Sequence, residues 1–317
     1  MRFTLLFGII FVSFAAFAEI ADVDFDQSMG IDNRARYNLL FRRGEYSEKT
    51  FNFYRNLYRR NKPSNIAPSI NPKIPKIIHQ IWIGPVPHPK LYQKYRDICL
   101  ALHPDWEYKL WTDIDIENWD FPNKDLYKKS ISYQERADII RYEILHKYGG
   151  LYLDADYMCL TKLDELNHLY DLYVGIEHPA KDYDSITISN ALIAAKPNHK
   201  IFPVLLKKIR DHWYDQKFKD IAKKNPKDVP AHRTMVPLTD AIYQTYDIND
   251  AVIAFPPTYF MPVAKQPLKS DYSIIDQVKL FFGMYQNVNT FGSIKEESLA
   301  YQDLFEPYIS PNLGKLQ

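Results

Sequence analysis

The segment from Ser132 to Leu160, "SYQERADIIRYEILHKYGGLYLDADYMCL", constrains the fold more than any other part of the chain. Ser132 and Glu135 have the spacing of a helix capping box, and the pair Gly149-Gly150 is a typical helix stop. Apolar residues recur between them at helical spacing, which predicts a core-facing helix: Ala137, Ile140, Ile144 and Tyr148. The short apolar run 151–153 then predicts a strand. The segment is therefore read as a helix, a tight turn and a strand.

Two aspartates, Asp154 and Asp156, follow this predicted strand directly in the sequence "DAD". Side chains two residues apart on a strand point to the same side. Like charges held close together repel, and a cation between them favours their ionised state. Hard oxygen ligands of this kind suit Mg²⁺ or Mn²⁺. The motif is read either as a solvated turn or as a site for such a cation.

The predicted helix carries a second pair of charges, Asp138 and Arg141, three residues apart and therefore neighbours on its surface. An ion pair on a solvated helix face is one reading of this spacing. Arg141 lies beside the apolar stripe, however, which favours partial burial and a functional role. Both readings remain open at this stage.

Strands and helices also alternate upstream of this segment. The apolar, β-branched run at 76–84 predicts a buried first strand, residues 90–104 predict a helix closed by Pro104, and 106–113 predict a second strand. This order predicts an α/β sandwich with a largely parallel sheet, in which ligands bind at the carboxyl ends of strands.

The N-terminal 72 residues differ in character from the rest of the chain. Residues 1–18 hold an apolar run of about 15 residues before an A-x-A pattern, as in a cleaved signal peptide or a short signal anchor. Residues 19–72 are read as a stem, with an amphipathic helix around Phe51, Tyr54 and Tyr58 and a proline-rich linker after it. The catalytic domain is expected at 73–317.

Composition adds two further expectations. The formal net charge of +1 gives no global field that would draw the chain to nucleic acid. The two cysteines, Cys99 and Cys159, are expected to be separate buried thiols, with a disulfide as the alternative in an oxidising compartment.

Three stretches together resemble glycosyltransferase family 32, the D-x-D sugar transferases: "IPKIIHQIWIG", "WEYKLWTD" and "ADIIRYEILHKYGGLYLDADYMCL". That family includes fungal Golgi initiating mannosyltransferases and bacterial capsule enzymes. The resemblance is strong over residues 74–165 and loose over 166–292. It implies a GT-A fold with a mixed, mostly parallel sheet between helices, a UDP- or GDP-sugar donor, Mn²⁺ or Mg²⁺, and retention of anomeric configuration.

The resemblance also implies roles for residues upstream of the acidic motif. Trp82, at the end of the first predicted strand, matches a tryptophan that stacks on the donor base. Core packing is the alternative role for this side chain. Asp138 and Arg141 match a helix pair that holds ribose and sugar hydroxyls of the donor, and Arg141 is also a catalytic candidate.

For the motif itself, the resemblance implies that Asp154 contacts the donor and the metal shell, and that Asp156 binds the metal directly. Tyr152 matches a donor-site tyrosine, for which core packing is again an alternative. Further along, Asn190 matches a residue near the acceptor side. The family's terminal His-Trp signature is absent, and Asn289 is a weak candidate for a late metal ligand.

The leading hypothesis is thus a metal-dependent retaining glycosyltransferase acting on a glycan, lipid or protein acceptor. A nucleotide-sugar hydrolase and a non-catalytic carbohydrate-binding protein are the alternatives. A signal peptide would place the protein in the Golgi or endoplasmic reticulum lumen or outside the cell, and an uncleaved segment would add a membrane association.

Overall fold

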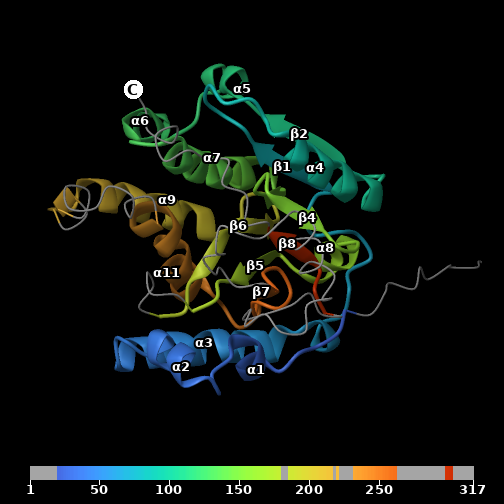
Figure 1. Cartoon of the computed structure of the whole chain (residues 1–317), viewed down its shortest axis with the longest axis vertical. Coiled ribbons are helices and arrows are strands. Elements are labelled where there is room, and N and C mark those ends of the chain that lie inside the picture. Colours follow the sequence, from blue (N-terminus) through green and yellow to red (C-terminus); the bar gives the residue numbers. More distant parts are fainter. Residues whose placement is uncertain (1–19, 180–184, 217–218, 221–230, 263–296, 303–317) are drawn as a thin grey trace, which may run out of the picture.

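The computed structural model describes residues 20–179, 185–216, 219–220, 231–262 and 297–302. Within these ranges a six-stranded sheet forms the centre of the molecule, in the order β2-β1-β3-β6-β5-β7 (Figure 1). Its strands are β1 Ile77–Ile81, β2 Glu107–Trp111, β3 Gly150–Leu153, β5 Leu172–Ile176, β6 Ile188–Ala195 and β7 Val252–Phe255. A second, two-stranded sheet joins β4 Tyr157–Cys159 to β8 Ala300–Gln302.

Helices pack against this sheet and around its ends. Figure 1 shows α7, α9 and α11 grouped together, and α1, α2 and α3 along one end of the molecule. The helices described are α1 Phe25–Met29, α2 Arg34–Leu40, α3 Glu45–Asn61, α4 Lys90–Leu102, α5 Asp113–Glu117, α6 Lys124–Lys129, α7 Tyr133–Tyr148, α8 Asp164–Leu169, α9 Ile201–Tyr214 and α11 Val236–Thr245. A short 3-10 turn at Pro63–Asn65 and a π-helical turn at Ala231–Met235 complete the list.

The strand directions confirm the expected mixed, mostly parallel α/β architecture. The pairs β1–β2, β1–β3 and β5–β7 are parallel, whereas β6 runs antiparallel to both β3 and β5. Every residue of β5 and β6 is buried, as expected for strands covered on both faces. The predicted first two strands and the helix between them are also confirmed, as β1, α4 and β2.

The long helix α7 begins and ends where the sequence signals predicted. The Ser132 side chain accepts the amide of Glu135, and Gly149 ends the helix with φ 63°. The predicted apolar stripe is only partly right: Ile140 and Ile144 are fully buried, but Tyr148 is 37% exposed. Buried polar residues also lie on this helix, so it makes polar contacts in addition to the apolar packing that the stripe predicted.

The turn from α7 into β3 requires glycine. Gly150 has φ +94°, and a Cβ atom there would lie 2.8 Å from the carbonyl oxygen of Ile77 and 3.0 Å from Nε2 of His79. Because β1 runs this close to the turn, a side chain would push the two parallel strands apart. The Gly-Gly pair therefore lets β3 enter the sheet beside β1.

The acidic motif does not continue the strand. β3 ends at Leu153, and the amide of Tyr157 donates to the carbonyl of Asp154 at 3.1 Å, so Asp154–Tyr157 form a tight turn that leads into β4. Asp154 and Asp156 therefore do not lie on a strand, and the prediction that strand alternation points both carboxylates to one side is wrong. The turn, rather than the strand pleat, determines the directions of Asp154 and Asp156.

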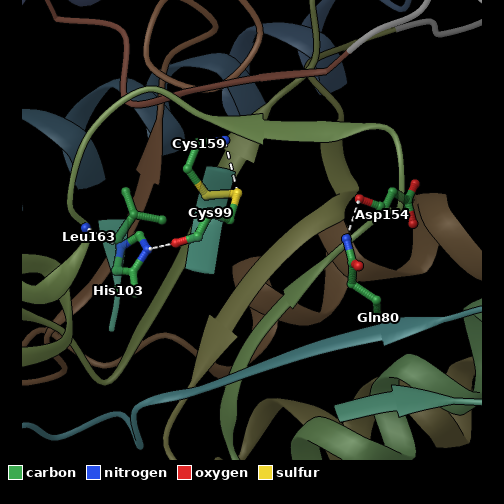
Figure 2. The surroundings of a disulfide bond; sticks show 6 residues. All are labelled: Gln80, Cys99, His103, Asp154, Cys159 and Leu163. Carbon is green, nitrogen blue, oxygen red and sulfur yellow. Dashed lines mark hydrogen bonds between the residues drawn. A yellow bond between two sulfur atoms is a disulfide. The ribbon is translucent and has the colours of Figure 1, made fainter. Parts of the chain in front are cut away.

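The expectation of two separate thiols is also wrong. Cys99 and Cys159 form a disulfide with an S–S distance of 2.13 Å and a sequence separation of 60. Figure 2 shows this bond joining Cys99, in α4, to Cys159, the last residue of β4. The physical reason is that α4 packs on β4, which brings together two cysteines whose spacing in the sequence gives no such indication.

The N-terminal helices share the core of the residues that follow. Helix α3 confirms the predicted amphipathic helix and contacts β7. Tyr54 donates to the carbonyl of Thr239 at 2.6 Å, and the hydroxyl groups of Tyr58 and Tyr259 lie 2.9 Å apart. Among the described residues, the structure contains no helix with the length and apolar character needed to cross a bilayer.

Candidate active site

The candidate site lies at one edge of the sheet, where two adjacent parallel strands end. Trp82 follows β1 and Asp154 follows β3, and the carboxyl ends of parallel neighbours meet at the same edge. The third neighbour, β6, approaches from the other direction. Its Ala191 carbonyl accepts the amide of Asp154 at 2.8 Å, which places Asn190 beside the motif.

Arg141 joins the helix to the acidic motif. Its Nη2 lies 2.9 Å from Oδ1 of Asp138, and its Nη1 lies 3.1 Å from Oδ1 of Asp154. Nη1 also donates to the carbonyl of Asn190 at 2.6 Å. The side chains of Asp138 and Arg141 are each only 4% exposed, so the solvated ion pair is excluded. The helix pair and Asp154 of the DAD motif therefore form one continuous charge network, buried at Asp138 and Arg141 and partly exposed at Asp154.

Tyr152 completes the enclosure of this arginine. The Arg141 guanidinium carbon lies 4.4 Å from the centre of the Tyr152 ring, and the Tyr152 hydroxyl donates to Oδ1 of Asp154 at 2.7 Å. Burial alone would lower the pKa of Arg141, but the carboxylates of Asp154 and Asp138 raise it above its usual value. A permanent positive charge thus lies against the first aspartate of the motif.

Asp138 is held by neutral donors as well as by Arg141. The Asn190 amide donates to Oδ1 at 2.9 Å, and the Thr234 hydroxyl donates to Oδ2. Complete burial raises the pKa of Asp138 to about 6, although Arg141, Thr234 and Asn190 each lower it. The carboxyl group therefore titrates near the physiological range.

Asp154 and Asp156 differ in their surroundings. The side chain of Asp154 is 29% exposed, and Arg141 and Tyr152 both contact its Oδ1. Asp156 contacts Gln302 instead, whose amide nitrogen is 3.3 Å from Oδ1 and 3.2 Å from Oδ2. Both carboxylates are only partly buried and can therefore be reached from solvent.

Trp82 lies at the same sheet edge but belongs to an aromatic cluster. Its indole N–H donates to the carbonyl of Val86 at 2.7 Å, and its ring packs edge-on against His88 at 4.8 Å and more loosely against Tyr92 at 6.1 Å. The ring is half-buried. This arrangement holds the indole in one orientation while leaving part of its surface accessible, as a stacking platform requires.

No sequence pattern pointed to Thr234 or Gln302. Asn190, which the resemblance implies near the acceptor side, donates its amide to Asp138, a contact that the resemblance did not imply. Thr234 lies in the π-helical turn Ala231–Met235, and only the tertiary structure brings its hydroxyl group to Asp138. Gln302 had no sequence signal, because only the pairing of β8 with β4 brings it to the motif. Asn289, the predicted late metal ligand, lies outside the described residues.

The fold and this edge define the molecule as an α/β protein with an acidic, arginine-braced site at the carboxyl ends of β1 and β3. The sequence profile of the capsular polysaccharide synthesis protein family matches residues 41–220, which is more than half of the chain. The chain therefore belongs to the capsular polysaccharide synthesis protein family.

Curated relatives extend this comparison. Inositol phosphoceramide mannosyltransferase 2 of Schizosaccharomyces pombe is 35% identical over 153 residues, which are 45% of this chain and 41% of that protein. Mannosyl phosphorylinositol ceramide synthase SUR1 of Saccharomyces cerevisiae is 36% identical over 165 residues, which are 47% of this chain and 40% of that protein. The matched segments thus span about two fifths of the length of these relatives.

Among solved structures, the PaToxG glycosyltransferase aligns with a TM-score of 0.43 and 18% sequence identity, covering 62% of this chain and 77% of that chain. The α/β class of the present chain rests on its own strand order and directions.

Proposed function

We propose that this protein is a metal-dependent glycosyltransferase that transfers a sugar from a nucleotide-sugar donor with retention of configuration. The observation that carries the proposal is the buried Asp138–Arg141 pair, whose arginine contacts Asp154 of the DAD motif at 3.1 Å. An ion pair that only stabilises the fold would not need to contact a partly exposed carboxylate such as that of Asp154. The chain's membership of a polysaccharide-synthesis family supports the same function, as does its 35–36% sequence identity to two proteins with mannosyl-transferring or mannosyl-lipid-forming names.

The residues of the site fit a divalent cation. The turn from Asp154 to Tyr157 presents two carboxylates, and oxygen donors of this type are those that Mg²⁺ and Mn²⁺ prefer. Asp154 and Asp156 would hold the ion, which when bound neutralises the diphosphate leaving group of the donor. Arg141 holds the Asp154 carboxylate in place through its contact at 3.1 Å.

The remaining residues have separable tasks in this proposal. Trp82 stacks on the donor base at the end of β1. The Asp138 side chain is only 4% exposed and both of its oxygens are already hydrogen-bonded, so we assign it to positioning Arg141 rather than to direct contact with donor hydroxyl groups. Because Arg141 is enclosed by Asp138, Asp154, Tyr152 and Asn190, we assign it mainly a positioning role rather than direct contact with phosphate.

The relatives' names guide the choice of substrates. Both are mannosyl-transferring or mannosyl-lipid-forming proteins by name, and both names refer to inositol-containing ceramides. We therefore propose a mannosyl donor, carried by GDP or UDP, and a lipid acceptor with a phosphoinositol head group as the first pair to test. Glycan and protein acceptors follow in the same assay.

For location, we propose a secretory-pathway lumen. Residues 1–18 would act as a signal peptide or short anchor ahead of the transferase domain at 73–317. The Cys99–Cys159 disulfide supports this proposal, since disulfides persist in oxidising compartments and are rare in the cytosol.

The test is a donor screen with the purified full chain, UDP- and GDP-sugars, Mn²⁺ and each acceptor class. Asp156→Ala should reduce transfer by about 100-fold or more, because a bound cation contributes several kcal/mol and each 1.4 kcal/mol is tenfold. Asp211→Ala, at an exposed surface ion pair on α9, is the matched control. Product anomeric configuration, read by NMR, tests retention.

Three outcomes would contradict this proposal. Transfer that survives exhaustive chelation removes the metal dependence. Fast release of nucleotide with no gain from any acceptor indicates a hydrolase instead. Sugar binding without turnover, unchanged in Asp156→Asn, indicates a non-catalytic binding protein.

A further inference from the structure

Gln302 brings a side-chain amide to the second aspartate of the DAD motif from 146 residues further along the chain. The antiparallel pairing of β4 with β8 places Gln302 directly opposite Tyr157, the residue after Asp156. This pairing brings the amide next to the acidic turn.

The amide is centred on the carboxylate rather than directed at one oxygen. Its Nε2 lies 3.3 Å from Oδ1 and 3.2 Å from Oδ2 of Asp156. A glutamine amide carries a donor nitrogen at one end and an acceptor oxygen at the other, with almost the same shape. A half-turn about the last side-chain bond therefore places Oε1 where Nε2 lies, with no movement of β8.

The spacing suits a shared cation. Octahedral Mg²⁺ or Mn²⁺ holds oxygens at about 2.0–2.1 Å, so adjacent ligands are about 2.9 Å apart. The observed 3.2–3.3 Å between the Gln302 amide and the Asp156 oxygens is a few tenths of an ångström from this value. Carboxamide oxygens, like carboxylates, are hard ligands of the kind these cations accept.

We propose that Gln302 is a ligand of the cation bound by the DAD motif. With no cation, its N–H group donates to the Asp156 carboxylate, and on cation binding the amide turns over and presents Oε1. This inference rests on the proposed function for the motif itself, and it adds β8 to the cation site. Cation binding should therefore also stabilise the pairing of β8 with β4.

The test measures Mn²⁺ binding to the full chain by the loss of the free Mn²⁺ EPR signal, with no donor present. Gln302→Leu keeps the approximate size of the side chain and removes the oxygen, so it should weaken Mn²⁺ binding by about tenfold or more. Gln302→Glu supplies a charged oxygen and should bind Mn²⁺ at least as tightly as the wild type. The Mn²⁺-induced rise in melting temperature should follow the same order.

Gln216→Leu is the matched control, because Gln216 donates its amide to Asp220 at 2.8 Å on the exposed surface. It should leave Mn²⁺ affinity unchanged. Unchanged affinity in Gln302→Leu, with Asp156→Ala abolishing binding, overturns the role of Gln302 and leaves the proposed cation site intact. Absence of Mn²⁺ binding in the wild type overturns both. If Gln302→Leu does not fold, Gln302→Glu decides: weaker binding than wild type overturns the proposal.

Discussion

Nη1 of Arg141 lies 3.1 Å from Oδ1 of Asp154, so a residue inside helix α7 contacts the acidic turn that follows β3. The same guanidinium contacts Asp138 on its own helix at 2.9 Å. One planar group thus fixes the position of the turn relative to the helix. The contact connects the two parts of the sequence signature into a single site.

Arg141→Lys should reduce kcat/KM by at least about tenfold while leaving the fold intact. A lysine ammonium is a compact charge that cannot reproduce the planar contacts to Asp138, Asp154 and the Asn190 carbonyl at the same time. Steady-state kinetics with circular dichroism measure both properties. Arg210→Lys is the control, since Arg210 makes a two-pronged contact to Asp125 at the surface. Full activity in Arg141→Lys would mean that the charge alone is sufficient.

Activity should fall as the pH drops through about 6, because Asp138 becomes protonated and loses its ion pair with Arg141. Asn resembles the protonated form, so Asp138→Asn at pH 7.5 should be about as slow as the wild type near pH 5. A pH profile of kcat/KM for both proteins measures this. A wild-type profile that stays flat down to pH 5 would contradict the assignment.

The stability contribution of Asp138 should change in the opposite direction. Its folded-state pKa of about 6 lies above the ordinary value of 3.8, so the folded protein takes up this proton first. Its contribution to the free energy of unfolding therefore increases as the pH falls from about 6 to 4. The difference between wild type and Asp138→Asn in urea unfolding isolates this effect from the buried histidines. A wild-type free energy of unfolding that stays constant or falls relative to that of Asp138→Asn as the pH drops over this range would show that the pKa is not raised.

Removal of the disulfide should destabilise the protein and weaken cation binding together. A cross-link that closes a loop of 60 residues contributes about 4 kcal/mol in the chain-entropy description. Figure 2 shows the bond at Cys159, the last residue of the strand β4 that follows the acidic turn. Cys99→Ser/Cys159→Ser should lower the melting temperature by several degrees and raise the Kd for Mn²⁺. Wild type treated with dithiothreitol is the parallel sample. A stable variant with unchanged Mn²⁺ affinity would limit the bond to a minor role.

Trp82→Ala should raise the donor KM by roughly tenfold, with a smaller effect on kcat. Stacking of an aromatic ring on a base contributes about 1–3 kcal/mol, and 1.4 kcal/mol is one decade. Trp82→Phe should recover much of the loss because it keeps a stacking face. Initial-rate kinetics and thermal melting separate the two roles. A lower melting temperature with an unchanged donor KM would assign Trp82 to the aromatic cluster with His88 and Tyr92 alone.

Local signals were enough to locate the central elements. The serine cap, the two glycines and the apolar run that follows predicted α7 and β3, because caps, left-handed turns and side-chain periodicity act within a few residues of the chain. The position of the DAD motif after β3 followed from the same local order. The conformation of the motif could not be predicted in this way. The same residues can end a strand or form a turn, depending on which segment the next residues pair with.

Burial and long-range pairing were decided by the tertiary structure alone. The spacing of Asp138 and Arg141 is the same on a solvated face and on a buried one. Here β6 and the π-helical turn at Ala231–Met235 both pack beside α7, and the two side chains are only 4% exposed. Asn190 and Gln302 reach the motif through strand pairings, and Cys99 reaches Cys159 through the packing of α4 on β4. Such contacts depend on the register of distant segments, which the free energy of the whole packed core determines and no local pattern encodes.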